Sequence, residues 1–145
     1  MNTRVVVAGY GNPLRRDDGV GWRVAEVLAS RWPVTLLTGQ QPVPEWSTTL
    51  AEADVAYFVD AGVSTRTRLR LRRLTAHDTT AFEGHALGAE QVLALVQVLY
   101  GRCPNAYLLE LPVYDLSFGD TLTPSAAQAA TRAVRLLDRR LAALP

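Results

Sequence analysis

Short apolar runs alternate along the chain with longer segments in which apolar positions recur at helical spacing. The short runs are rich in Val, Leu and Ala and carry few charges, which is typical of strands buried on both faces. They lie at residues 4–8, 34–37, 55–59 and 106–113. The longer segments predict helices with one apolar stripe. They lie at residues 20–31, 44–53, 90–101 and 124–141.

Residues at the helix ends support this pattern. Asp17 or Asp18 is expected to cap the first helix, and Pro44 marks the start of the second. Gly101 stands where a C-terminal cap belongs, and Thr123 followed by proline predicts the start of the last helix. The predicted stripes are Val20, Val24, Val27 and Leu28 in the first helix, Val92, Leu95, Val96 and Leu99 in the third, and Ala127, Ala130, Val134, Leu137 and Leu141 in the last.

Arginines alternate with uncharged residues between Arg66 and Arg72. This period of two predicts a strand over residues 66–73 with one solvated face, at or near an edge of the sheet. We interpret the charges as protection of that edge against aggregation. Docking of an acidic partner is the alternative interpretation.

Strands that alternate with helices predict a mostly parallel sheet covered by helices on both faces. No repeat or linker interrupts residues 1–145, so the sequence predicts a single α/β domain. Ligands of such folds bind beyond the carboxyl ends of the strands. Functional residues are therefore expected at residues 9–18, 60–64 and 82–85.

The amino-acid composition argues against several classes of function. The 145 residues carry a net charge of +1, which gives no general electrostatic reason to bind nucleic acid or an acidic membrane. All fifteen basic residues are arginines, so a lysine phosphate loop and a lysine Schiff base are excluded. The apolar stretch at residues 92–100 is too short to span a membrane. The single cysteine, Cys103, cannot form an intrachain disulfide, and a reducing cytoplasm fits best.

Three groups that can bind a divalent ion follow three predicted strands, at Asp18, Asp60 and His85. The topology places their loops along one edge of the sheet. Two carboxylates and an imidazole suit nickel, zinc, manganese or iron and leave positions open for water or substrate. The residue types leave open which metal binds and whether it polarises a carbonyl, generates hydroxide or holds a substrate.

The glycine-rich loop that starts at Gly9 does not match a dinucleotide site. The third glycine of that fingerprint would fall at Leu14, and the adjacent acids Asp17 and Asp18 would repel a phosphate. A tight turn with an aspartate cap is the simplest interpretation of this loop taken alone.

Several motifs together resemble the maturation endopeptidases of nickel-iron hydrogenases. They occur in the same order and at similar spacings as in that family. They are Gly9-Tyr10-Gly11-Asn12 with Leu14 and Asp17-Asp18-Gly19-Val20-Gly21, then Val59-Asp60-Ala61, then His85-Ala86-Leu87-Gly88. The resemblance implies a phosphorylase/hydrolase-like single domain, a three-layer α/β/α arrangement with a twisted, mostly parallel sheet of about five strands.

The resemblance further implies an activity and a partner. Such an enzyme removes the C-terminal extension of the hydrogenase large-subunit precursor after nickel insertion. We expect this protein to act in the cytoplasm and, by default, as a monomer. The metal-ligand and catalytic positions carry over to Asp18, Asp60 and His85, with nickel carried by the substrate, and other divalent metals able to replace it. Substrate contacts carry over to Gly9, Gly11, Asn12 and Asp17. Whether the metal or a carboxylate activates the attacking water stays open.

Two alternatives use the same strand ends. The first loop is also similar to the opening of bacterial peptidyl-tRNA hydrolases, but Arg15, Arg16, Asp17 and Asp18 stand where that family needs a histidine. A nucleotide- or metabolite-binding module with Asp60 on a ribose hydroxyl is the alternative outside enzymes. The missing third glycine argues against it.

Overall fold

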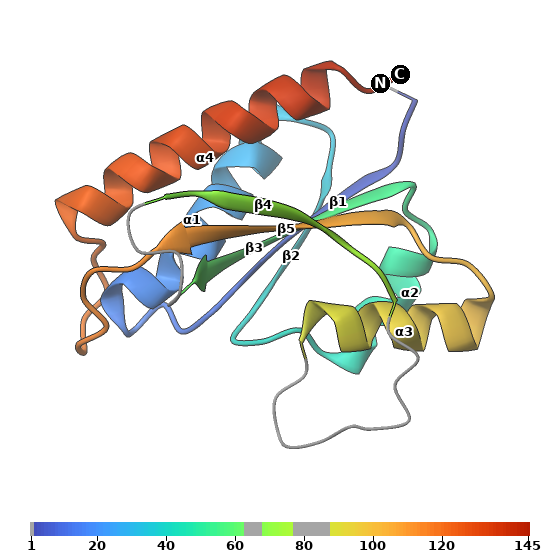
Figure 1. The fold of residues 1–145 in the computed structure, drawn as a ribbon, viewed down its shortest axis with the longest axis horizontal. Helices are drawn as coiled ribbons and strands as arrows, with labels where there is room; N and C mark the ends of the chain where they lie inside the picture. The colour runs from blue at the N-terminus through green and yellow to red at the C-terminus, as the bar shows by residue number, and fades with distance from the viewer. Residues whose placement is uncertain (1, 63–67, 77–87) are drawn as a thin grey trace.

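The computed structural model describes residues 2–62, 68–76 and 88–145 and shows one five-stranded sheet between helices (Figure 1). The strands lie in the order β2 (Thr35–Gly39), β1 (Val5–Tyr10), β3 (Val55–Gly62), β5 (Asn105–Pro112) and β4 (Arg70–Leu74). The first four strands are parallel, and β4 is antiparallel to β5. The predicted single-domain α/β fold with a mostly parallel sheet of five strands is confirmed.

Helices cover both faces of the sheet. One face carries α1 (Val20–Arg31) and α4 (Pro124–Ala142), and the other carries α2 (Ser47–Ala51) and α3 (Ala89–Tyr100). Two short 3-10 turns, η1 (Arg16–Gly19) and η2 (Pro44–Trp46), lead into α1 and α2.

Alternate residues of each central strand enter two separate cores. Val7 and Val59 pack against α1 and α4, whereas Ala8 and Phe58 pack against α2 and α3, and all four side chains are fully buried. Because successive side chains of a strand point to opposite faces, every strand residue is assigned to one helix layer by its position. This alternation also sorts the polar residues at the strand ends.

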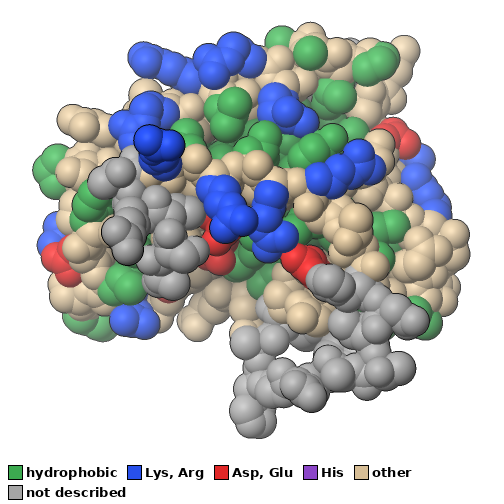
Figure 2. All heavy atoms as spheres, viewed as in Figure 1, with side chains coloured by type: hydrophobic (Ala, Val, Ile, Leu, Met, Phe, Trp, Pro, Cys, Tyr) green, Lys and Arg blue, Asp and Glu red, His purple; other side chains and the backbone are tan. Residues whose placement is uncertain are grey.

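The arginine-rich segment is an edge strand, as predicted. β4 pairs only with β5 among the described strands, and arginine side chains spread over the front of the molecule where β4 lies (Figure 2). The strand begins at Arg70 instead of Arg66, and Arg66 lies outside the described residues.

Three details of the prediction are wrong. No side chain caps α1, whose N-cap is Gly19, because the chain first forms η1. β3 does not stop before Asp60 but continues to Gly62, paired throughout with β5. Leu99 is 58% exposed, and Leu93 takes its place in the buried stripe of α3 because the helix packs through its first half.

The two ends of the described chain lie side by side (Figure 1). The amides of Asn2 and Thr3 donate to the carbonyl oxygen of Pro145 at 3.1 and 3.3 Å. Within the described residues, no helix is both long and apolar enough to cross a membrane.

Candidate active site at the carboxyl ends of the strands

A row of polar side chains crosses the sheet where three parallel strands end. Asp60 of β3 pairs in register with Glu110 of β5. Gly9 pairs with Val59, so Tyr10 of β1 stands beside Asp60 at the next position. By strand alternation, all three side chains belong to the face that carries α2 and α3. Polar side chains therefore meet at the carboxyl ends of these parallel strands, where ligands of such folds bind.

Asp60 is the most strongly perturbed group of this row. Burial raises its pKa to about 7, and the negative charges of Asp18 and Glu110 add to the rise. A hydrogen bond from the amide of Ala61 to Asp60 Oδ1, at 2.8 Å, acts in the opposite direction. A carboxyl group in such surroundings is stabilised when it binds a proton or when a cation lies beside it.

The ring of Tyr10 lies beside the carboxyl group of Asp60. Burial raises the pKa of Tyr10 well above its ordinary value, and the negative charges of Asp60 and Glu110 raise it further. The ring of Tyr10 lies 6.4 Å from that of Trp46, centre to centre. Tyr10 therefore stays a neutral phenol that shields one side of Asp60.

Arg72 joins the row to the first turn of α3. Its Nη1 lies 2.9 Å from Oε1 of Glu90, and its Nε lies 3.9 Å from Oε1 of Glu110. These contacts connect the edge strand, β5 and the start of α3. His85 precedes α3 by four residues in sequence but lies outside the described residues, so the structure leaves its predicted role untested.

The loop after β1 brings Asp18 to the same place. The amide of Asn12 donates to Asp18 Oδ2 at 2.7 Å, and the charge of Asp18 acts on the pKa of Asp60. Gly11 has a φ of 134°, and a Cβ there would stand 2.0 Å from the carbonyl oxygen of Asp18. Glycine is thus required for the loop to turn back on Asp18.

Asp17 has a different environment from the one its motif predicts. The side chain is fully buried. It accepts hydrogen bonds from the amides of Tyr114, Asp115 and Thr123, at 2.9, 3.0 and 2.8 Å, and from Thr123 Oγ1 at 2.9 Å. These bonds tie the loop after β1 to the segment before α4, and the substrate contact of Asp17 stays a prediction. The predicted cap is wrong, because the carboxylate serves another part of the chain.

An open cavity of about 680 Å³ adjoins Asp18. Asn12, Arg15 and Asp18 line one side, and the segment from Thr38 to Gln41 lines another. The predicted site residues Asn12 and Asp18 are therefore accessible to a ligand, whereas Gly9 is buried in the strand.

Glu110, Arg72 and Tyr10 were not predicted from the sequence to be candidate site residues. Glu110 interrupts an apolar strand run, and a charge within such a run at a strand end is a signal that could have found it. Among residues 2–62, 68–76 and 88–145, no three His, Cys, Asp or Glu side chains are grouped so as to hold a metal ion. The predicted ligand His85 lies outside these residues.

Comparisons with known proteins point in one direction. No protein-family model matches the chain, and no curated protein matches it. Among solved structures, the hydrogenase maturating endopeptidase HybD from Escherichia coli is 25% identical, with 95% of this chain and 91% of that chain covered and a TM-score of 0.77. The hydrogenase 2 maturation peptidase from a Thaumarchaeota archaeon is 26% identical, with coverage of 95% and 97% and a TM-score of 0.69.

A third solved structure shows the likeness of fold alone. The [NiFe] hydrogenase maturation protease HycI from Thermococcus kodakarensis is 23% identical, with 94% of this chain and 91% of that chain covered and a TM-score of 0.75. The two likenesses at 25% and 26% identity support an endopeptidase role. In fold as in motif the chain resembles the hydrogenase maturation endopeptidases, and the resemblance predicted from its sequence is confirmed.

Proposed function

We propose that this protein is an endopeptidase that removes the C-terminal extension of a nickel-iron hydrogenase large-subunit precursor once nickel has been inserted. The observation that carries the proposal is the carboxyl group of Asp60 at the strand ends, with Asp18 near it. Its pKa is raised by burial and by the charges of Asp18 and Glu110. The named activity of the similar solved structures supports the same reaction.

In this proposal, Asp18, Asp60 and His85 recognise the nickel that the precursor carries. Carboxylate and imidazole donors suit nickel and other borderline divalent ions. Burial and the charges of Asp18 and Glu110 raise the pKa of Asp60, so a cation beside this group would stabilise its charged form and make the loaded precursor the preferred partner of the site. The nickel thereby places the scissile bond at the row.

Hydrolysis of the scissile bond involves Asp60, Asn12 and the cavity beside Asp18. Water adds to the scissile carbonyl carbon, the C–N bond breaks, and the leaving amine takes up a proton. Asp60 stands at the centre of the row. Without a cation its pKa lies at about 7, and a cation beside it would favour the carboxylate, so that binding of the loaded precursor releases the proton of Asp60. Asn12 and the cavity beside Asp18 receive the extension.

The test uses the nickel-loaded precursor and the purified protein. We expect Asp60→Asn and His85→Ala to abolish the shortening of the precursor, read by mass spectrometry, while circular dichroism stays unchanged. Asp54→Asn is the matched control, because Asp54 lies at the opposite end of β3, where it pairs with Arg4 and Arg102. Full processing by both site variants would refute the ligand assignment. Failure of the unaltered protein to shorten any loaded precursor would refute the function.

A further inference from the structure

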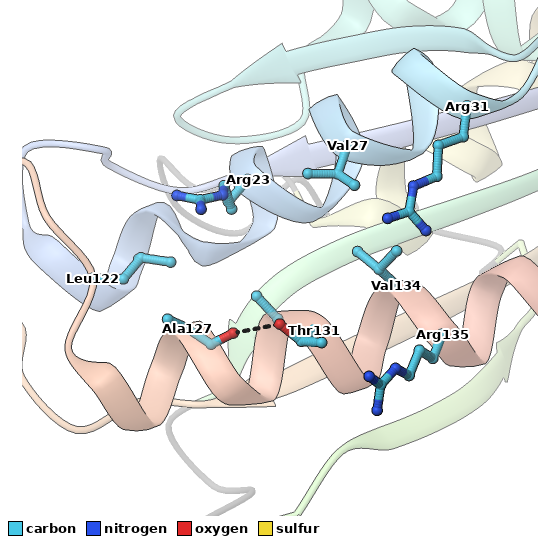
Figure 3. A pocket seen from close by; sticks show the side chains of 9 residues that line it. Arg23, Val27, Arg31, Leu122, Ala127, Thr131, Val134 and Arg135 are labelled. Atoms are coloured by element: carbon cyan, nitrogen blue, oxygen red, sulfur yellow. Dashed lines mark hydrogen bonds between the residues drawn. The ribbon is translucent and has the colours of Figure 1, made fainter.

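A groove between α1 and α4 has the composition of a docking surface. It encloses about 300 Å³. Its α1 side carries Arg23, Val27 and Arg31, which recur every four residues and so form one stripe of the helix (Figure 3). Its α4 side carries Thr131 and Arg135 with the same spacing (Figure 3). The α1 stripe thus places Val27 between two arginines, and the α4 stripe adds a third arginine to the rim of the groove.

All charged side chains that line this groove are positive. Three arginines line it, and no acidic residue is among the lining side chains. Arg31 is neutralised by Asp138, whose Oδ2 lies 2.7 Å from Arg31 Nη1. In the part of the chain that the structure describes, no carboxylate lies within 4.0 Å of the guanidinium of Arg23 or Arg135. Among the described residues, the two exposed positive charges of Arg23 and Arg135 therefore flank the groove with no carboxylate at ion-pair distance.

The floor of the groove is apolar and only partly covered. Val27 and Leu122 are partly exposed there, next to Val134. Apolar surface rimmed by charges of one sign fits a ligand that is apolar on one stripe and acidic on its flanks.

The spacing of the charges indicates a protein segment as that ligand. The two unpaired charges come from different helices, Arg23 from α1 and Arg135 from α4 (Figure 3). A ligand that meets both charges has to cross the apolar floor of the groove, which a protein segment with acidic residues on both flanks of an apolar stripe can do. Glu26 and Asp120 line the adjoining hollow that Arg23 also lines, which disfavours the continuous phosphates of a nucleic acid.

We propose that the groove between α1 and α4 binds an acidic amphipathic segment of a partner protein. The groove belongs to the helix layer opposite the face of Asp60, because α1 and α4 pack on the other side of the sheet. A partner held there leaves the row of Tyr10, Asp60 and Glu110 free. The proposal does not depend on the peptidase function.

The experiment measures binding of a synthetic peptide to the full chain. The probe is a fluorescein-labelled 16-residue helix with leucines on one stripe and glutamates on its flanks, and a second probe carries lysine in place of glutamate. We expect the acidic probe to bind and the lysine probe not to bind. The variant R23A/R135A is expected to bind the acidic probe about tenfold or more weakly than the unaltered protein does. The variant R132A/R139A is the control, since it removes the same charge from exposed positions of α4 outside the groove.

The location of binding is read independently. Amide resonances of residues 23–31 and 122–135 are expected to shift when the acidic probe is added. All four substituted arginines are exposed, so the variants are expected to keep the fold, which a thermal melt checks. Equal losses in the two double variants, shifts confined to other residues, or stronger binding of a single-stranded RNA or of phosphatidylserine vesicles would each overturn the proposal.

Discussion

At the scale of single residues, Asp17 and Asp18 show how neighbours in sequence acquire different roles. Asp17 is fully buried and accepts four hydrogen bonds from the segment at Tyr114, Asp115 and Thr123. Asp18 is partly exposed and accepts one hydrogen bond, from the amide of Asn12. The first carboxylate therefore stabilises the loop, and the second is available to a ligand.

The substitution Asp17→Asn is expected to lower the free energy of unfolding by about 2–4 kcal/mol. The new amide group would face N–H donors that a carboxylate satisfies, and one of its own atoms is a donor. Asp18→Asn is the control and is expected to cost less than about 1 kcal/mol, since one hydrogen bond is concerned. Urea denaturation measures both, and equal losses would contradict the division of roles.

The raised pKa of Asp60 predicts a pH dependence of stability. The folded protein holds a proton on this carboxyl group up to about pH 7, whereas an ordinary aspartate releases it near 3.8. The stabilising contribution is thus fully present below the lower value and is lost as pH rises through about 7.

Asp60→Asn removes this dependence because an amide does not titrate. Relative to this variant, the unaltered protein is expected to lose about 1–3 kcal/mol of stability between pH 4.5 and 7.5. Thermal melts across that range check the result. A constant difference between the two proteins would show that Asp60 titrates normally.

At the scale of elements, the contact of α1 with the sheet positions the site. A Cβ on Gly21 would stand 2.3 Å from the carbonyl oxygen of Val59 and 2.8 Å from that of Tyr10. Both atoms are backbone atoms directly beside the row, so they cannot move without moving the ends of β1 and β3. The glycine in α1 therefore sets how closely the helix approaches the strand ends.

Gly21→Ala is expected to cost about 1–3 kcal/mol through overpacking and to slow precursor processing, because the strand ends shift. Gly101→Ala is the control at the end of α3. Its left-handed φ of 69° makes alanine unfavourable by about 1 kcal/mol, but no atom lies within 4 Å of the new Cβ. We expect Gly101→Ala to leave processing unchanged. Similar losses of activity in the two variants would contradict the close-approach argument.

Most elements could be predicted from the sequence, and the errors have physical causes. Thr123 caps α4 as expected, with its Oγ1 accepting from the amide of Ala126 at 3.2 Å, because this signal is local. The aspartate cap of α1 was predicted wrongly because Asp17 bonds to residues about 100 positions away in sequence. A local cap rule contains no such contact.

At the scale of the whole molecule, the sheet separates the two proposed sites. Asp60 lies on the face of α2 and α3, whereas the groove belongs to the layer of α1 and α4. We expect Asp60→Asn to change the affinity for the acidic peptide by less than about twofold, because distant sites without shared partners act independently. Fluorescence anisotropy measures this. A large loss would reveal coupling through the sheet.

The sequence by itself determined the α/β class, the edge position of the arginine-rich strand and the two accessible acids of the candidate site, Asp18 and Asp60. These follow from local periodicity and from the rule that parallel strands end at one edge. Only the tertiary structure decided that Glu110 stands beside Asp60, that Asp17 is buried, and that Arg23 and Arg135 face one groove. The physical reason is that strand register and helix packing bring together residues that are far apart in the chain, and pKa values and surface charge depend on those contacts.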